Sequence, residues 1–403
     1  METLKFLFTT TFYPPYHIGG DAVHVKYLAE ELARRGHEVH VLHSLDAYRI
    51  KRKNLPKKVE TDGVYTHVID TRFSLSPYAV YLLGDSSVIL RKFQELIREI
   101  KPDIVHHHNI SLLGYSLLKK QGNYLNLYTA HDYWLICQQN NLMRTRTEIC
   151  DGNGFCALCA LRRRRPPQLW RYSKAFKTAV NDVDLLISPS NYLREKILKS
   201  FNVKVVTIPN FAPEPPRDIK PSGFSNFFLY AGVLEEYKGV LNLVKAYEDI
   251  SEEVEAKLII VGDGSLKTKI EEDVKKNEMK DKILVLGFVN RNKLYSLLKD
   301  ANALIIPSIW PENNPLIAIE ALSVGTPIIA SNKGGLPEIV GKIDKNLIYR
   351  FLDELKNVLL NFNENKYPRC KLKAIYEKHY SPQSYIERYF SLIPYQTSRL
   401  TQV

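Results

Sequence analysis

The sequence predicts an α/β protein with two domains, each built around a parallel β-sheet. Short β-branched runs alternate with amphipathic helical patterns along the whole chain, which is typical of strands joined by crossover helices. A segment with five prolines and no periodicity, Pro209–Gly223, divides this alternation into two series. The length of 403 residues agrees with two domains, because a single core rarely serves more than about 300 residues.

The first series, residues 1–208, has the pattern of a Rossmann-like domain. Two of its helical stretches, 22–35 and 87–100, are followed by residues that end helices, Gly36 and Pro102. The strands that we expect here are Leu4–Phe8, Val39–His43, Ile104–His106, Leu125–Thr129, Leu185–Ile187 and Val205–Ile208.

The second series, residues 209–380, repeats the alternation after the proline-rich segment. The strands that we expect here are Phe227–Tyr230, Lys257–Val261, Ile283–Leu286, Ala303–Ile306 and Pro327–Ala330. The tail, residues 381–403, carries a helical pattern at Ser381–Leu392, and we expect it to pack back on the first domain. Two such domains would face each other across a cleft, since α/β sheets bind ligands beyond the carboxyl ends of their strands.

Composition limits the classes of partner. The net charge of +12 indicates an anionic partner, such as nucleic acid, an acidic membrane surface or a phosphorylated substrate. No nucleic-acid-binding motif accompanies the charge, so we do not expect nucleic acid to be the partner. No apolar run approaches the about 18 residues of a membrane-spanning helix. Residues 1–11 lack the pattern of an export signal, and we expect a cytoplasmic protein.

Three glycine loops follow strands and precede helices. Gly19–Gly20 would let the backbone approach an anion at a helix N-terminus, where free N–H groups and the helix dipole attract negative charge. Gly232 and Gly239 flank Lys238, a mobile cation suited to phosphate. Gly262–Gly264 ends the next strand in the same manner. The alternative to anion binding is structural: the glycines would only form tight turns, and Lys238 would be a solvated surface residue.

Two glutamates eight residues apart mark the strongest candidate site, within Pro307–Glu338. Asn314 suits a helix cap and Pro315 suits the first helical turn, so we expect Glu312 in the loop and Glu320 inside the helix. A carboxylate can accept paired hydrogen bonds from a diol, and each such bond contributes about 1.5–3 kcal/mol in a dry site. One glutamate could then bind sugar hydroxyls while the other binds a ribose.

The order of these motifs resembles glycosyltransferase family 4, whose members have the GT-B fold and a Glu-x7-Glu motif. The resemblance covers nearly the whole chain. The matching segments are Gly19–Gly20, Gly36–Val39, His131–Asp132, Ile208–Asn210, Lys238–Gly239, Gly262–Gly264, Leu286–Val289 and Glu312–Glu320.

The resemblance implies an activity and a set of site residues. A sugar would pass from a nucleotide-sugar donor, a UDP- or GDP-sugar, to a lipid-linked or glycan acceptor, with retention of anomeric configuration and no required metal. Lys238 would hold the diphosphate, Gly20 would approach it and Glu320 would bind the ribose. Glu312 and the following loop would bind the sugar, and His131 would face it. The implied catalytic residues are His131, Lys238 and Glu312, and the implied donor site comprises Gly19, Gly20, Gly232, Lys238, Gly262, Asp263, Phe288, Val289, Glu312, Asn313, Asn314, Pro315, Leu316 and Glu320.

Two positions depart from the family pattern. Val233 stands where many members have an arginine after the glycine, which removes one expected contact with the diphosphate. Asn313–Pro315 replaces the usual Gly-Phe-Gly after the first glutamate, which leaves the donor sugar open.

Histidines, cysteines and arginines form further clusters. His106–His108 follows a strand, where alternate faces prevent all three rings from binding one ion. Four cysteines lie close together in the chain: Cys137, Cys150, Cys156 and Cys159. Their spacing suits a structural zinc or iron–sulfur site, and the alternatives are reduced thiols or a disulfide. The run Arg162–Arg165 lies within the same insertion, 137–170, and precedes Trp170 and Tyr172. It is either a solvated face or a contact with an anionic membrane or lipid phosphate, which would place the protein peripherally on the cytoplasmic face.

Two other functions compete with sugar transfer. A sugar-nucleotide 2-epimerase of the same fold would use a similar cleft, but the glutamate spacing together with Gly19–Gly20 favours transfer. A non-catalytic protein organised by metal could instead use its cysteines and arginines to bind nucleic acid or an anionic surface.

Overall fold

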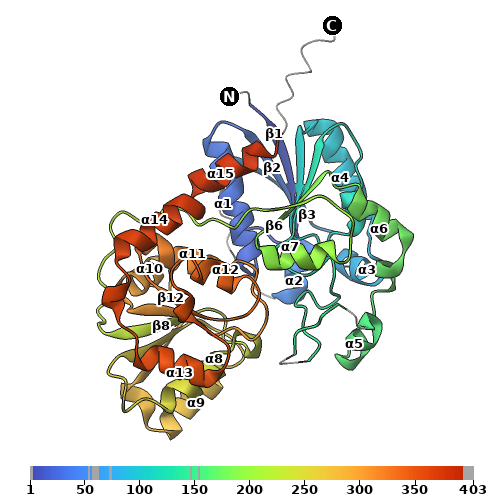
Figure 1. Ribbon diagram of the computed structural model, residues 1–403. Coiled ribbons are helices and arrows are strands. Elements are labelled where there is room, and N and C mark those ends of the chain that lie inside the picture. Colours follow the sequence, from blue (N-terminus) through green and yellow to red (C-terminus); the bar gives the residue numbers. More distant parts are fainter. Residues whose placement is uncertain are drawn as a thin grey trace.

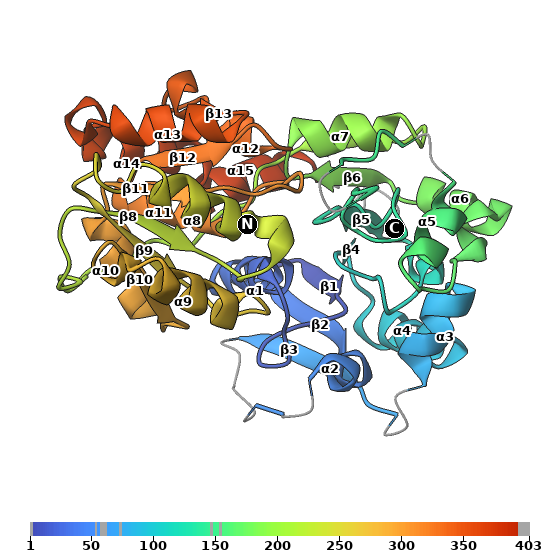
Figure 2. The ribbon, with the colours of Figure 1, turned by 90° about the horizontal axis from the view of Figure 1, so that it is seen from below.

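The computed structural model describes residues 3–52, 55–56, 63–71, 75–145, 148–152 and 155–393. These residues form two α/β domains that lie side by side (Figures 1 and 2). Every strand pairing is parallel, with the order β3-β2-β1-β4-β5-β6-β7 in the first sheet and β10-β9-β8-β11-β12-β13 in the second. The predicted α/β class with two parallel sheets is confirmed.

The N-terminal domain holds the seven-stranded sheet. Its strands are β1 (Lys5–Thr9), β2 (Glu38–Ser44), β3 (Val64–Ile69), β4 (Ile104–His107), β5 (Leu125–Thr129), β6 (Leu185–Ser188) and β7 (Val205–Thr207). Its α-helices are α1 (Gly20–Arg34), α2 (Leu45–Lys51), α3 (Ser76–Leu83), α4 (Ser87–Ile100), α5 (Cys156–Arg162), α6 (Lys174–Asn181) and α7 (Asn191–Leu198), with 3-10 turns η1 (Tyr115–Leu118) and η2 (Leu169–Tyr172). The sequence did not predict β3, because this edge strand is buried only at its first and last residues.

The C-terminal domain holds the six-stranded sheet. Its strands are β8 (Phe227–Ala231), β9 (Lys257–Val261), β10 (Ile283–Gly287), β11 (Ala303–Ile306), β12 (Ile328–Ser331) and β13 (Ile348–Tyr349). Its α-helices are α8 (Val240–Glu248), α9 (Lys267–Lys276), α10 (Arg291–Asp300), α11 (Leu316–Val324), α12 (Leu336–Val340), α13 (Leu352–Leu360) and α14 (Arg369–His379), with 3-10 turns η3 (Glu236–Lys238), η4 (Met279–Asp281), η5 (Lys345–Leu347) and η6 (Glu364–Lys366).

The last described helix, α15 (Pro382–Ser391), returns to the N-terminal domain (Figure 1). Its apolar face, which includes Tyr385 and Tyr389, packs in one buried cluster with Phe6 and Phe8 of β1. The Tyr389 hydroxyl also lies 3.0 Å from Nδ1 of His106. Packing and a polar contact therefore fix this helix on the first sheet. Residues 394–403 of the predicted tail lie outside the described residues.

The strand orders determine where a ligand can bind. In each sheet the order reverses at its first strand, between β1 and β4 in one domain and between β8 and β11 in the other. Ligands of α/β sheets bind beyond the carboxyl ends of the strands at such switch points. The loops that follow β1, β8 and β11 are therefore the ones positioned for ligand contact, and they carry Gly19–Gly20, Gly232 and Glu312.

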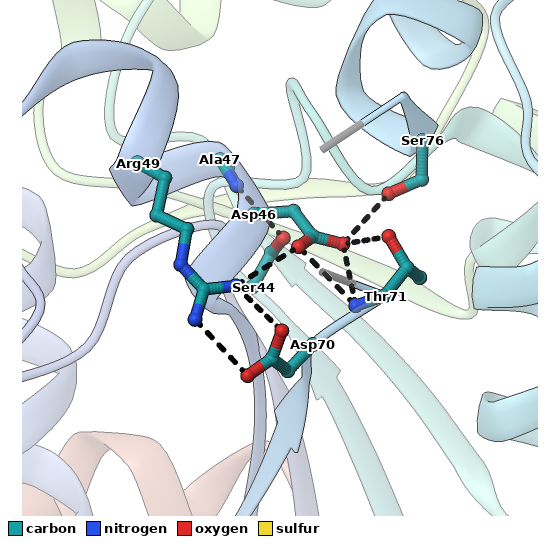
Figure 3. A network of polar contacts seen from close by, with 7 residues as sticks. All are labelled: Ser44, Asp46, Ala47, Arg49, Asp70, Thr71 and Ser76. Atoms are coloured by element: carbon teal, nitrogen blue, oxygen red, sulfur yellow. Dashed lines mark hydrogen bonds and ion pairs between the residues drawn. The ribbon is translucent and has the colours of Figure 1, made fainter. Parts of the chain in front are cut away.

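A buried carboxylate joins the ends of β2 and β3 to the starts of α2 and α3 (Figure 3). Asp46 is fully buried and accepts hydrogen bonds from the Thr71 hydroxyl at 2.7 Å and the Ser76 hydroxyl at 3.3 Å. Arg49 lies 3.6 Å from the same carboxylate and binds Asp70 at 2.5 Å. These contacts fix the first residues of α3 relative to the sheet.

Candidate active site

The loop after β11 buries Glu312 beside a cation. Its Oε1 atom accepts a hydrogen bond from Nζ of Lys238 at 2.7 Å and another from the hydroxyl of Ser308 at 2.7 Å. Its backbone oxygen accepts the N–H of Gly335 at 2.6 Å. Glu312 is 5% exposed, so the ion pair is almost entirely shielded from water on the carboxylate side.

Close backbone packing and two aromatic rings position Lys238. The lysine ends η3, and Gly239 is the N-cap of α8 with φ of 71°. A Cβ atom at Gly239 would lie 1.9 Å from the backbone oxygen of Pro307, so only glycine fits between the two loops. The ammonium group lies 5.1 Å from the ring centre of Trp310 and 5.6 Å from that of Tyr237, where the ring faces attract a cation.

The other predicted loop residues of this domain have mainly structural contacts. A Cβ atom at Gly262, where φ is 142°, would lie 1.8 Å from the backbone oxygen of Gly232, so the loops after β8 and β9 are packed backbone to backbone. The exposed side chain of Asp263 accepts the N–H of Gly264. After β10, Phe288 is 82% exposed, and Val289 packs on the core. In the described residues no hydrogen bond joins these residues to Lys238 or Glu312.

Glu320 lies on α11 beside an arginine that the sequence did not indicate. Nη2 of Arg291 is 3.2 Å from its Oε1 atom. Burial raises the pKa of Glu320, and the arginine opposes this effect. The guanidinium also packs over the rings of Tyr27 and Tyr295, at 4.9 and 5.3 Å from the ring centres. Since Tyr27 belongs to α1, Arg291 links the second glutamate to the opposite domain.

The N-terminus of α1 faces α11 of the C-terminal domain. A Cβ atom placed on Gly20, the first residue of α1, would lie 3.8 Å from the Leu316 side chain. Gly19 precedes it with φ of 90°, a conformation that favours glycine. The free N–H groups of the first turn of α1 therefore lie at the interdomain boundary, where they favour an anion.

His131 reaches this boundary from the end of β5. Its Nε2 atom lies 3.0 Å from Nδ1 of His108, and its backbone oxygen accepts a hydrogen bond from the Asn313 amide at 2.8 Å. Burial lowers its pKa to about 4, although Asp21 acts in the opposite direction. The imidazole is therefore neutral near pH 7. Burial also raises the pKa of the adjacent Asp132 to about 7, although part of that side chain reaches the surface.

A group from the N-terminal domain and a group from the interdomain connection hold the loop 311–314. The Tyr133 hydroxyl donates to the backbone oxygen of Pro311 at 2.9 Å, and the Asn210 amide donates to that of Asn314 at 2.9 Å. Glu338, at the start of α12, accepts the backbone N–H groups of residues 191 and 192 at 2.9 and 2.8 Å. Among the described residues, the buried Oδ1 atoms of Asn313 and Asn314 have no hydrogen-bond partner.

The helix start after this loop differs from our prediction by one residue. Pro315 is the N-cap, with ψ of 131°, and α11 begins at Leu316. Asn314 does not cap the helix, since its side-chain oxygen accepts no hydrogen bond from the described residues. The expected placement of Glu312 before the helix and Glu320 within it is what the structure shows.

The histidine run alternates faces of β4, as a strand requires. His106 lies 2.8 Å from the Thr129 hydroxyl, whereas His107 lies 2.7 Å from the Thr9 hydroxyl. No disulfide joins the four cysteines of the insertion in the part of the chain that the structure describes, and burial raises the pKa of Cys137 and Cys156. Within the described ranges, no three His, Cys, Asp or Glu side chains are arranged to hold a metal ion. The predicted zinc or iron–sulfur site thus gains no support from the structure.

A cavity of about 1340 Å³ lies elsewhere, behind the interdomain connection. Residues of that connection, such as Glu214 and Arg217, line it together with Arg369 and Lys373 of α14. None of the predicted site residues borders this cavity. No helix within the described ranges combines the length and apolarity needed to span a membrane.

Comparison with known proteins finds a glycosyltransferase family model in each half of the chain. The model of "Glycosyltransferase Family 4" matches residues 18–213, and that of "Glycosyl transferases group 1" matches residues 215–369. An uncharacterized glycosyltransferase of Methanocaldococcus jannaschii is 27% identical over 84% of this chain and 83% of its own. The N-acetyl-alpha-D-glucosaminyl L-malate synthase of Bacillus anthracis is 26% identical over 84% of this chain and 81% of its own.

Solved structures share the architecture. Sucrose-phosphate synthase from Thermosynechococcus elongatus aligns with a TM-score of 0.70 and 17% identity, over 99% of this chain and 100% of its own. Anabaena HepE in complex with UDP-glucose aligns with a TM-score of 0.65 and 14% identity, over 97% of this chain and 99% of its own. With family models matched in both domains and the GT-B arrangement of two parallel sheets, the chain belongs to glycosyltransferase family 4.

Proposed function

We propose that the protein transfers a sugar from a nucleoside diphosphate sugar, a UDP- or GDP-sugar, to a glycan or lipid-linked acceptor, with retention of anomeric configuration. Residues 209–380 would bind the donor, and residues 1–208 would bind the acceptor. The observation that supports this best is the buried pair of Lys238 and Glu312, which His131 approaches from the other domain through its contact with Asn313.

The proposed donor position follows from the charges. Breaking a glycosyl phosphate bond places negative charge on the leaving diphosphate, so fixed positive groups near it lower the barrier. Lys238 and the N-terminus of α1 are two such groups, and Gly20 lets the backbone come close. Glu320 would bind the ribose, with Arg291 fixing its carboxylate.

The sugar would lie between Glu312 and His131. The loop carboxylate and the free Oδ1 atoms of Asn313 and Asn314 are acceptors for sugar hydroxyls. A neutral imidazole adds a further polar contact without repelling the positive charge that develops on the sugar. The donor phosphate would take the proton of the acceptor hydroxyl, and the contacts between the domains would limit hydrolysis by water.

A nucleotide screen tests the proposal. UDP-, GDP-, ADP- and dTDP-sugars are compared in thermal unfolding, because a ligand at 100 times its Kd stabilises the folded state by about 2.7 kcal/mol. The donor that stabilises the protein is then incubated with candidate acceptors, and the anomeric configuration of the product is read by NMR. Failure of every nucleotide sugar to stabilise the protein would refute the proposed function, and an inverted product would refute retention. Conversion to a 2-epimer would favour the isomerase instead.

A further inference from the structure

Exposed apolar side chains cover the end of the N-terminal domain that points away from the C-terminal domain. They lie on or beside α3, α5 and η2, elements that both ribbon views place at this end (Figures 1 and 2). Phe155 is 87% exposed and Leu83 is 70% exposed. We call this the distal apolar surface; it comprises Leu75, Tyr78, Leu82, Leu83, Val88, Phe155, Leu158, Leu161, Leu169 and Tyr172.

Internal contacts hold these elements together while their apolar side chains remain outside. The Tyr81 hydroxyl of α3 donates to the backbone oxygen of Pro166 at 3.2 Å, and the Trp170 indole donates to that of Tyr81 at 3.1 Å. The Asp46 network fixes the first residue of α3, Ser76, as described above (Figure 3). The helix thus buries Val80 and presents its other face to solvent.

The two segments that carry most of this surface hold charge of one sign, with Asp85 and Asp151 just outside them. Residues 155–177 contain seven arginines and lysines and no aspartate or glutamate, and residues 75–84 contain no charged residue. Arg163 donates to the backbone oxygen of Met143 and Arg165 to the amide of Gln139, so both are tied to the domain. Arg162 and Arg164 are exposed, and no carboxylate of the described residues forms an ion pair with them.

We propose that the distal apolar surface docks on an anionic lipid bilayer. Its apolar side chains would enter the boundary between headgroups and acyl chains, and Arg162 and Arg164 would contact lipid phosphates. Single exposed leucines are common on soluble proteins, but ten exposed apolar side chains on neighbouring elements indicate an interaction site. Apolar residues beside a run of cations match the interface of an anionic membrane. Leucine side chains would add nothing to binding of a nucleic-acid backbone, whose contacts are ionic.

Flotation of the full-length protein with vesicles tests the proposal. We expect binding to vesicles of phosphatidylcholine mixed with phosphatidylglycerol, and none to phosphatidylcholine alone. The pair Arg162→Ser and Arg164→Ser should weaken binding about 30-fold, since each cation at an anionic surface contributes about 1 kcal/mol and each 1.4 kcal/mol is a factor of ten. The pair Phe155→Ser and Leu161→Ser should weaken binding at least about tenfold, because their apolar area no longer leaves water.

Matched changes on the other domain provide the controls. Lys275→Ser with Lys276→Ser removes the same charge from exposed positions of α9, and Phe351→Ser removes an aromatic ring that is 70% exposed. These variants should bind mixed vesicles as the parent protein does. Thermal unfolding with and without the stabilising nucleotide shows that every variant is folded, and it keeps the docking result separate from the proposed function.

Three results would overturn the proposal. The first is an absence of binding to mixed vesicles, and the second is equal weakening in the variants of both domains. The third is release from vesicles by inorganic phosphate but not by sodium chloride of equal ionic strength, because the arginines would then form a phosphate site and not a membrane contact. Retention on DNA without vesicle binding belongs to the first result and would assign the charge to nucleic acid.

Discussion

Replacing Lys238 by alanine tests the proposed donor site most directly. The ammonium group lies 2.7 Å from the Glu312 carboxylate, and the two side chains are 22% and 7% exposed. Removal of the lysine leaves the carboxylate buried with Ser308 as its remaining side-chain donor. An uncompensated charge of this kind lowers the free energy of unfolding by about 3–5 kcal/mol, so the variant should melt at a lower temperature than the parent protein without any ligand.

The same variant should lose most of the stabilisation by nucleotide. A lysine bond to a diphosphate contributes about 2 kcal/mol, which corresponds to about 30-fold in Kd. A concentration that stabilises the parent protein by about 2.7 kcal/mol would then stabilise Lys238→Ala by about 0.9 kcal/mol. Thermal unfolding at one fixed nucleoside diphosphate concentration measures both values.

Glu312→Gln separates the two effects. It breaks the same ion pair but retains Lys238, whose ammonium group is partly solvated. We expect this variant to keep the stabilisation by nucleoside diphosphate and to lose sugar transfer. If Lys238→Ala keeps the full stabilisation while Glu312→Gln loses it, the lysine does not hold the diphosphate and the donor assignment is wrong.

Three further predictions follow from contacts around the boundary. Burial raises the pKa of Asp132 to about 7. Between about pH 4 and 7 the folded state therefore keeps a proton that the unfolded state has released. The free energy of unfolding should fall as the pH rises through this window. The difference in unfolding free energy between the parent protein and Asp132→Asn should therefore change by up to about 1.4 kcal/mol per pH unit there, as measured by denaturant titration at each pH; a flat difference would contradict the shift. His108→Phe removes the 3.0 Å partner of the His131 ring and should lower kcat while the KM for the nucleotide sugar stays unchanged; a rise in KM alone would argue against a positioning role. Glu338→Ala removes the carboxylate that caps α7 at Asn191 across the domain boundary, which should lower stability by about 1 kcal/mol and speed amide exchange in the first turn of α7.

The sequence predicted most strands because a run of apolar residues indicates a buried strand. Strands at the centre of the two sheets, such as Ile104–His107 and Ala303–Ile306, are buried along their whole length. The second is apolar throughout, and the first begins with two β-branched residues. The edge strand Val64–Ile69 is exposed at several positions and carries no such signal. The loop position of Glu312 and the helical position of Glu320 also followed from local residues, since the helix start depends only on neighbouring side chains.

Contacts between distant segments could not be predicted in this way. Arg291 precedes Glu320 by 29 residues and follows Tyr27 by 264 residues. Nothing near Arg291 in the chain distinguishes it from a surface arginine. The pairing of His108 with His131 likewise depends on neighbouring β4 and β5. The family resemblance pointed to His131 and Glu320 as site residues, but nothing in the sequence indicated the groups that contact them.

The loop Asn313–Pro315 differs in sequence from the family pattern, and residues far away in the chain hold it in place. Pro315 has no N–H group, so this chain has one backbone donor fewer at the start of α11 than a chain with glycine there. The asparagines place amide groups at the same point. The Asn313 amide is bonded to His131 of the opposite domain, and the Asn314 backbone oxygen is bonded to Asn210 of the interdomain connection. The two buried Oδ1 atoms have no hydrogen-bond partner within the described residues. Since acceptors select hydroxyl donors and cannot hold an anionic sugar, we expect this loop to favour neutral sugars over uronic acids, and competition between UDP-glucose and UDP-glucuronic acid in the unfolding assay measures that preference. Equal stabilisation by both, with UDP as the reference, would show that the loop does not contact the sugar.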